Sequence, residues 1–291
     1  MILVTGATGT AGSQVVRALR ARGANVRAFV RDPERARHVF GDEVDLAAGD
    51  FADASSVRAA LEGVETMLLS CADDPRRVEW ETSAIDAAAT AGVRRIVKLS
   101  TIGAAAGAPV AFWDWHGRVE EHLWSSGVPA VILQSSFYMS NVLAAAEQVA
   151  NESRLYAPAG EARVAMIDPR DVGAAAAAAL MGAGQDGRTY VITGPEAITW
   201  GRIAADLSSA TGREVEFVDV PDERARQGLV VAGLPEFVAE QLITIFGQLR
   251  QGVAEQVTDG VYALTGSRPR SFAEFARDHA HMFEPAVAGR R

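Results

Sequence analysis

A glycine-rich turn near the start of the chain constrains the fold more than any other feature. Gly6, Gly9 and Gly12 lie between a short apolar run, Ile2–Val4, and a helical pattern that begins at Ser13. Strand, glycine-rich turn and helix in this order predict a pyrophosphate site. The first glycine allows the tight turn, the second lets the backbone approach the anion, and the third lets helix and strand pack closely. Unpaired amides at the helix start would face the anion. The expected contacts are Gly6, Thr8, Gly9, Thr10, Ala11 and Gly12.

Apolar runs and helical patterns alternate strictly over the first part of the chain, which predicts a parallel sheet with right-handed crossovers. The expected fold class is α/β, a Rossmann-type doubly wound parallel sheet with a smaller, mostly helical C-terminal substrate cap. Residues 1–150 would bind the cofactor, residues 168–195 would return to the sheet, and residues 196–291 would form the cap. The expected strands are Ile2–Val4, Asn25–Val30, Val44–Ala48, Val64–Ser70, Arg95–Ser100, Ala130–Leu133 and Tyr190–Thr193.

Past residue 150 the alternation breaks down. Arg163–Ile167 is expected to be a short strand. Asp168-Pro169 would start a helix, with the aspartate as N-cap and the proline in the first turn. A further helix would be capped by Thr199, and another strand would lie near Val215–Val218.

The end of the second strand bears on the choice of cofactor. A carboxylate there would accept hydrogen bonds from a ribose 2′-hydroxyl, whereas an arginine would hold a 2′-phosphate. Arg31 comes first, Asp32 second, and Arg35 lies one helical turn further on. We therefore favour NADP(H) over NAD(H), with Arg31 on the phosphate. In the alternative, Arg31 is a solvated strand end and Asp32 caps the helix that Pro33 opens.

Other strand ends should line the same edge, because ligands of parallel sheets bind beyond the carboxyl ends of the strands. Asp50-Phe51 would lie beside an adenine ring, with a plain turn as the alternative. Cys71 is interpreted as a small lining residue rather than a redox or nucleophilic one. Further expected cofactor contacts are Ser70 and Ala72, Ser100 and Thr101 near the nicotinamide, and Ser136 and Phe137 in the loop after the sixth strand.

Two residues are candidate proton donors. His116 and Glu120 are four residues apart on a predicted helix and so share one face, where the carboxylate would orient the imidazole near the substrate. In the alternative, His116 is an ordinary hydrogen-bonded helix histidine. Tyr138 carries a phenol that could donate a proton or simply line the pocket.

Composition limits the other functions. A net charge of −9 argues against general nucleic-acid binding. The single cysteine excludes an internal disulfide and a cysteine-based zinc site, so no metal is expected, and it suits a reducing, cytoplasmic compartment. We expect no signal peptide before the first strand, and no apolar run is long enough to span a membrane. The oligomeric state stays open, a homo-oligomer included.

Taken together, these motifs make the chain resemble NmrA-like members of the atypical short-chain dehydrogenase/reductase superfamily, and within it the NAD(P)H:quinone reductase and triphenylmethane reductase group. Two departures stand out. The superfamily's usual Tyr-x-x-x-Lys is absent, and Gln134-Ser135-Ser136 stands where relatives tend to have Arg-Pro-Asn. The matching stretches are Thr5–Gly12, Val30–Pro33, Gly49–Phe51, Ala91–Ser100, His116 with Glu120, and Thr193–Pro195.

The resemblance implies an NADPH-dependent reductase that transfers a hydride to a quinone or another conjugated or aromatic carbonyl acceptor. The expected partner is therefore a small aromatic or quinone-like molecule. A quinone needs little acid help because its product oxyanion is delocalised, which fits the missing Tyr/Lys pair. The aromatic wall would come from Trp113, Trp115, Phe137 and Tyr138. The alternative is a non-catalytic NADP(H)-sensing regulatory protein.

Overall fold

The computed structural model describes residues 1–285, so the end of the expected cap, 286–291, lies outside the described residues. The chain forms two compact units, each built from several segments. Unit 1 comprises Met1–Ser135, Pro169–Ile192 and Gly260–Ser267. Unit 2 comprises Ser136–Asp168, Thr193–Asp259 and the chain from Arg268 onward.

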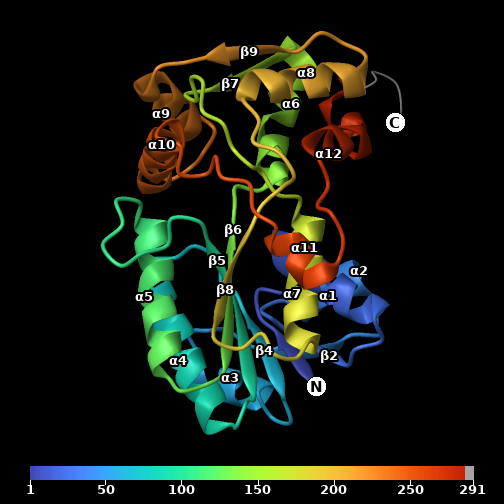
Figure 1. Cartoon of the computed structure of the whole chain (residues 1–291), viewed down its shortest axis with the longest axis vertical. Helices are drawn as coiled ribbons and strands as arrows, with labels where there is room; N and C mark the ends of the chain where they lie inside the picture. The colour runs from blue at the N-terminus through green and yellow to red at the C-terminus, as the bar shows by residue number, and fades with distance from the viewer. Residues whose placement is uncertain (286–291) are drawn as a thin grey trace. The chain divides into compact units, whose positions relative to one another are not determined.

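Unit 1 holds a parallel sheet, which within the described residues has seven strands in the order β3-β2-β1-β4-β5-β6-β8 (Figure 1). The chain winds outward from β1 to β3 and then crosses back to β4, so the strand order reverses beside β1. This is the doubly wound sheet that the alternating pattern predicts, and that prediction is confirmed. The strands are β1 Ile2–Val4, β2 Val26–Val30, β3 Asp45–Ala48, β4 Thr66–Leu69, β5 Arg95–Thr101, β6 Ala130–Ser135 and β8 Arg188–Ile192.

Helices cover both faces of this sheet (Figure 1). On one face α1 packs against α7, which also contacts α11; on the other face α4 contacts α3 and α5. The approach of α1 and α7 is close, because a Cβ at Gly173 would lie 2.6 Å from the Gln14 Cβ. The helices are α1 Thr10–Ala21, α2 Pro33–Phe40, α3 Ala54–Ala60, α4 Arg77–Thr90, α5 Ala111–Ser125, α7 Pro169–Met181 and α11 Gly260–Thr265.

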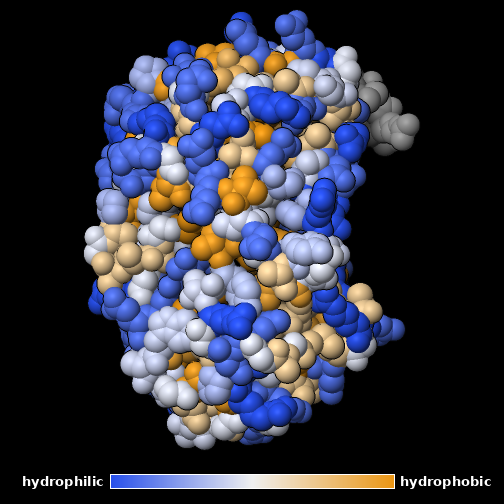
Figure 2. Space-filling model, viewed as in Figure 1, coloured by the Kyte–Doolittle hydropathy of each residue, from blue (hydrophilic) through white to orange (hydrophobic). Residues whose placement is uncertain are grey.

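The core of unit 1 lies between the sheet and its helices. Leu19, Met67, Ile85 and Ile96 are fully buried there. Central strands of a parallel sheet are covered on both faces, which explains their continuous apolar runs. Lys98, equally buried in the middle of β5, is a charged residue within such a strand. On the face shown in Figure 2 hydrophilic side chains predominate, with hydrophobic ones between them, as on an ordinary protein surface.

The described part of unit 2 is mostly helical and carries one pair of parallel strands, β7 and β9. Thr199 caps α8 as predicted, because its hydroxyl accepts a hydrogen bond from the Arg202 amide. The helix α9 packs on α10, and α12 packs on α8. The elements are η1 Met139–Ala145, α6 Ala146–Glu152, β7 Arg154–Ala157, α8 Trp200–Thr211, β9 Glu216–Asp219, α9 Asp222–Val231, α10 Glu236–Arg250, α12 Phe272–Asp278 and η2 Ala280–Phe283.

The expected strand at Arg163–Ile167 is wrong. Val164 forms an isolated antiparallel bridge with Ile198, while the next amide, that of Ala165, donates to the carbonyl of Ala254. A strand needs successive residues paired with one neighbour. Because successive residues here bond to different segments, an extended but irregular loop forms instead. Separately, none of the helices in residues 1–285 is long and apolar enough to cross a membrane.

Candidate functional site at the carboxyl ends of the strands

The glycine-rich turn joins β1 to α1 at the carboxyl edge of the sheet. Gly6 has a left-handed backbone with φ +59°, and a Cβ there would lie 2.8 Å from the Ser70 carbonyl oxygen. A Cβ at Gly12 would lie only 2.1 Å from the Gly6 carbonyl oxygen, so no larger residue fits. The N-cap of α1 is Gly9, which has no side chain to cap the helix, and the first turn holds no acidic residue. The first amides of α1 are therefore arranged to receive an anion.

At the end of β2 the structure separates the roles of Arg31 and Asp32. The Asp32 carboxylate caps α2 by accepting a hydrogen bond from the Arg35 amide at 3.0 Å, and Pro33 takes the first helical position. The capping part of the alternative interpretation is thus confirmed. The Arg31 side chain is exposed, and no hydrogen bond or ion pair within residues 1–285 engages its guanidinium. Arg31 is therefore free to meet an anion.

Asp50 and Phe51 form a tight turn after β3. The Asp50 carboxylate accepts a hydrogen bond from the Ala52 amide at 2.8 Å. The half-buried Phe51 ring meets Phe29 edge-on, with centroids 5.7 Å apart. The turn is further held by the Ser56 hydroxyl, which contacts both backbone groups of Asp50. The plain-turn features are thus present, and contact with an adenine stays a prediction.

Thr5 ties the end of β1 to the end of β4. Its Oγ1 accepts a hydrogen bond from the Ser70 amide at 2.9 Å and lies 2.9 Å from the Ser70 carbonyl. The next residue, Cys71, is half-buried, and burial raises the pKa of its thiol to about 11. A thiol that stays protonated at neutral pH is a poor nucleophile, which agrees with the interpretation as a lining residue. Ala72, beside it, is exposed.

Behind these strand ends lies a buried polar cluster that sequence reasoning missed. Its members are Arg77, Glu81, Lys98 and His116. Arg77, at the start of α4, is 4% exposed; it donates to the Cys71 carbonyl and to His116 Nε2, and it pairs with Asp73 at 3.0 Å. The guanidinium thereby fixes the loop between β4 and α4 against α5.

Lys98 and Glu81 form an ion pair that is wholly inaccessible to solvent. The Lys98 Nζ lies 3.0 and 2.9 Å from the two Glu81 carboxylate oxygens and donates to the Leu99 carbonyl at 2.7 Å. Burial lowers the pKa of Lys98, and the Glu81 carboxylate opposes that effect. The signal that could have found the pair is a lysine in the middle of the predicted strand Arg95–Ser100, because a buried amine needs an acidic partner.

The predicted pairing of His116 with Glu120 is wrong. His116 lies against α4, where its Nε2 accepts the hydrogen bond from Arg77. Its proton is therefore on Nδ1, which has no hydrogen-bond partner in the described part of the chain. Burial, with Lys98 and Arg77, lowers the pKa of His116 well below its ordinary value. The imidazole is neutral at pH 7, which weakens it as an acid, and its catalytic role stays a prediction.

Glu120 contacts the strand ends instead. Its carboxylate accepts hydrogen bonds from the Ser100 hydroxyl and from Gln134 Nε2, the latter 3.0 and 3.2 Å from its two oxygens. Ser100 and Gln134 are register partners near the ends of β5 and β6. Burial raises the pKa of Glu120. Thr101 follows Ser100 and is half-buried.

Three predicted site residues follow β6 and belong to unit 2, whereas the others belong to unit 1. The Ser136 hydroxyl is buried without a hydrogen-bond partner among the described residues. The Phe137 ring lies 6.3 Å from the Trp200 ring, which in turn lies 5.4 Å from the Phe246 ring. Tyr138 is half-buried.

The tryptophans of the expected aromatic wall belong to α5 in unit 1. Trp113 is buried, and a Cβ at Gly103 would lie 2.7 Å from its ring. Trp115 packs edge-on against Phe112, with centroids 5.4 Å apart. Trp113 is thus a packing residue of unit 1.

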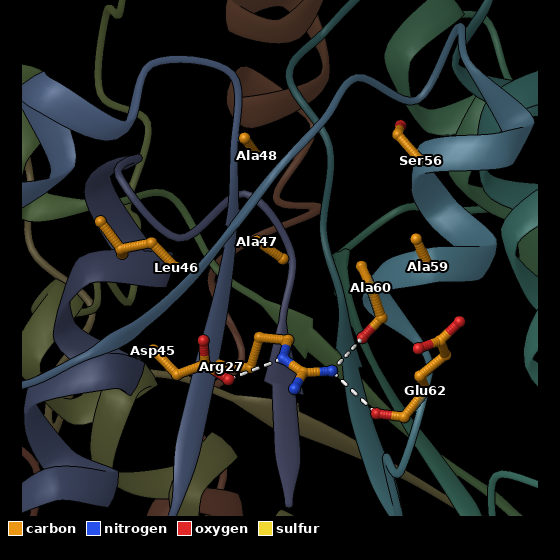
Figure 3. A pocket seen from close by; sticks show the side chains of 9 residues that line it. All are labelled: Arg27, Asp45, Leu46, Ala47, Ala48, Ser56, Ala59, Ala60 and Glu62. Carbon is orange, nitrogen blue, oxygen red and sulfur yellow. Dashed lines mark hydrogen bonds and ion pairs between the residues drawn. The ribbon is translucent and has the colours of Figure 1, made fainter.

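A cavity of about 270 Å³ lies at the outer edge of the sheet, lined by residues of β2, β3, α3 and the residues after α3 (Figure 3). Arg27 crosses it, bonding to Asp45 at 2.8 Å and to the carbonyls of Ala60 and Glu62 at 3.0 and 2.8 Å. None of the lining residues is a predicted site residue. Arg27 thus ties β2 to β3 and to the end of α3 across this cavity. In residues 1–285 no group of three or more His, Cys, Asp and Glu side chains is arranged to hold a metal ion.

The strand order and the glycine turn at α1 define a Rossmann-type α/β protein. The model of the NmrA-like family matches residues 1–276, and the chain belongs to this family.

Curated relatives match nearly the whole chain. It is 37% identical over 286 residues to an NAD(P)H azoreductase of Xenophilus azovorans, covering 98% of this chain and 100% of the relative. It is 38% identical over 286 residues, with the same coverage, to the (4-alkanoyl-5-oxo-2,5-dihydrofuran-3-yl)methyl phosphate reductase of Streptomyces griseus. Among solved structures, the NADPH-dependent quinone oxidoreductase QOR2 of Escherichia coli, complexed with NADPH, superposes with a TM-score of 0.88 at 28% identity, covering 98% of this chain and 100% of that one.

Proposed function

We propose that the chain is a reductase that uses NADPH to reduce a small, conjugated, electron-poor acceptor such as a quinone or an aromatic azo compound. The observation that carries the proposal is the anion cradle at the start of α1 together with Arg31, which is exposed and unengaged within residues 1–285, at the end of the neighbouring strand β2. The names of the relatives support it, because each is a reductase and the matching quinone reductase binds NADPH. A reducing, cytoplasmic location belongs to the same proposal.

The residues present fit the cofactor. The space at Gly12 admits no side chain, so the backbone of the turn can approach a pyrophosphate. Arg31 would hold the 2′-phosphate. The buried Ser136 hydroxyl has no hydrogen-bond partner among the described residues, so it is available to a bound cofactor. When bound, the cofactor supplies the hydride. The full proposed set is Gly6, Thr8, Gly9, Thr10, Ala11, Gly12, Arg31, Asp50, Phe51, Ser70, Cys71, Ala72, Ser100, Thr101, Ser136 and Phe137.

The acceptors in the names of the relatives share one chemical property. A quinone, an azo compound and an alkanoyl-substituted unsaturated lactone each carry an electron-poor π bond that can accept a hydride. Addition of a hydride to a quinone leaves a well delocalised oxyanion, so that reaction demands little from the protein beyond binding, orientation and exclusion of water. Addition to an azo bond leaves a more basic nitrogen anion, which needs a proton. The missing Tyr-x-x-x-Lys is compatible with quinone reduction.

Unit 2 is proposed to bind the acceptor. Phe137, Trp200 and Phe246 form a contiguous aromatic cluster in which Phe137 and Phe246 are half-buried. Flat conjugated molecules stack on such rings. Tyr138, the residue after Phe137, stays a candidate proton donor.

The test is NADPH oxidation by the purified protein with a quinone, an azo dye and an unsaturated furanone ketone, each repeated with NADH. We expect turnover with at least one acceptor and a lower KM for NADPH than for NADH. Tight NADPH binding without turnover of any acceptor would favour the regulatory alternative. A preference for NADH would show that Arg31 does not hold a 2′-phosphate.

A further inference from the structure

The side chain of Glu120 lies at the carboxyl ends of β5 and β6, and its hydrogen-bond partners within residues 1–285 are uncharged. Its hydrogen-bond donors are the Ser100 hydroxyl and the Gln134 side-chain amide. No lysine, arginine or histidine within residues 1–285 forms an ion pair with it. The side chain is half-buried rather than enclosed, so it can exchange a proton with solvent. A carboxyl group without a cation partner is the kind that can hold a proton.

Charged groups occur on most of the elements packed against α5, but none neutralises Glu120. The buried ones are Lys98 from β5, Arg77 and Glu81 from α4, and His116 from α5 itself. Of the less buried ones, His122 of α5 pairs with Asp86 of α4 at 2.8 Å. The strand β6 carries no charged side chain. Lys98 lowers the pKa of Glu120, but its amine forms an ion pair with the Glu81 carboxylate of α4 at 2.9 Å. Arg77 is committed to His116 and to the loop after β4. The neutral His116 adds no charge, and burial prevails, so the pKa of Glu120 is raised.

We propose that Glu120 donates the proton that completes reduction of the acceptor, with Ser100 and Gln134 as positioning residues; this rests on the proposed function. The two oxygens of Glu120 differ in the hydrogen bonds that they accept. Oε1 accepts from both Ser100 and Gln134, whereas Oε2 accepts from Gln134 alone within residues 1–285. The proton is assigned to Oε2, the less engaged oxygen.

An acceptor that has received a hydride from the reduced nicotinamide carries a negative charge on oxygen or nitrogen. The O–H bond of Glu120 breaks, a new O–H or N–H bond forms on the reduced acceptor, and Glu120 is left as a carboxylate. That carboxylate recovers its proton from solvent before the next turnover. The need for this proton is greatest for an azo compound, whose nitrogen anion is strongly basic, and smallest for a quinone.

The first test compares Glu120→Gln with Glu121→Gln, an exposed carboxyl next to it on the same helix. A positioned acid contributes about 10²- to 10⁴-fold to rate, so E120Q should lower kcat for an azo dye by roughly that factor and barely change it for a quinone. In the wild type and in E121Q, kcat for the azo dye should fall as pH rises through the pKa of Glu120, and E120Q should lose this dependence. An unchanged azo rate and pH profile in E120Q would overturn the proposal.

A second variant, Gln134→Arg, keeps the carboxyl group and adds a cation beside it. An adjacent guanidinium lowers the pKa of a carboxyl group by about 1 to 3 pH units, so the fall in azo reduction should move to lower pH by that amount. Carbon-13 NMR titration of the Glu120 carboxyl, in protein without cofactor, should show the same displacement and does not depend on activity. A carboxyl that titrates at its ordinary value, or a pH profile that Q134R leaves in place, would overturn the proposal. Absence of turnover by the wild type would instead refute the proposed function.

Discussion

Arg31 is the residue on which the choice of cofactor depends. Its guanidinium is exposed and unengaged within residues 1–285, whereas the neighbouring Asp32 carboxylate is committed to capping α2. A hydrogen bond to a charged group contributes about 1.5–3 kcal/mol, so Arg31→Ala should raise the KM for NADPH about 10- to 100-fold and leave that for NADH nearly unchanged. Steady-state kinetics with both cofactors measures this. Arg37→Ala, an exposed arginine on α2, is the control, and an equal loss for both cofactors would contradict the assignment.

Glu120 should also make the stability of the protein depend on pH. Because its pKa is raised in the folded protein, the native state holds more protons than the unfolded state between the ordinary pKa and the raised one. Its contribution is therefore fully present below the ordinary pKa and is lost as pH rises through the raised value. Urea unfolding measured across this pH range should show that the unfolding free energy of the wild type falls with pH more steeply than that of Glu120→Gln. Identical slopes would show that Glu120 titrates normally.

At the scale of elements, α4 and β5 are joined by a buried ion pair, and removal of one partner alone would leave the other charge buried without compensation. The Glu81–Lys98 pair is wholly buried, so Glu81→Gln leaves an uncompensated amine and should cost about 3–5 kcal/mol of unfolding free energy. The double change Glu81→Leu with Lys98→Met removes both charges and should recover most of the loss. Denaturant unfolding of the wild type, E81Q and the double variant measures these free energies. A double variant no more stable than E81Q would show that the pair does not stabilise the core through charge compensation alone.

The turn between β1 and α1 depends on glycine for its shape. A Cβ at Gly12 would lie 2.1 Å from the Gly6 carbonyl oxygen, so Gly12→Ala should displace the turn, cost about 1–3 kcal/mol of stability and weaken NADPH binding. Gly201→Ala in α8, where a Cβ meets nothing nearer than 3.7 Å, is the matched control and should be neutral or stabilising. Melting temperature and NADPH titration report both effects; a Gly12→Ala protein that binds normally would show that the turn tolerates a side chain.

The sequence predicts elements whose signal is local. Apolar runs bounded by turns locate the strands of unit 1, and Gly6 to Gly12 locate the first turn, because periodicity and backbone freedom depend only on neighbours in the chain. Arg163–Ile167 fails because its hydrogen-bond partners come from distant segments. The buried polar cluster around Arg77 could not be predicted for the same reason. Helical spacing puts Arg77 and Glu81 on one face but does not show that this face packs against His116 and Lys98. The partner of Glu120 is likewise decided by tertiary packing rather than by the i, i+4 spacing to His116.

In the whole molecule, each unit has its own proposed role, because unit 1 holds the cofactor cradle and unit 2 holds the aromatic cluster. Phe246→Ala should raise the KM for a polycyclic aromatic acceptor about 5- to 10-fold, from the loss of roughly 1 kcal/mol of ring contact, and should not change the KM for NADPH. A small aliphatic enone serves as the matched acceptor that lacks a ring to stack. An equal effect on both acceptors would place aromatic binding elsewhere.

Hydride transfer itself is tested most directly with NADPH carrying deuterium at the nicotinamide C4, in two preparations labelled on opposite faces. The acceptor is an unsaturated furanone ketone, and mass spectrometry of its product is the measurement. We expect one preparation to deliver one deuterium to carbon in the product and the other to deliver none, because the protein presents a single face of the cofactor to the acceptor. Reduced product without deuterium from either preparation, or no product at all, would contradict the proposal that this chain is an NADPH-dependent reductase.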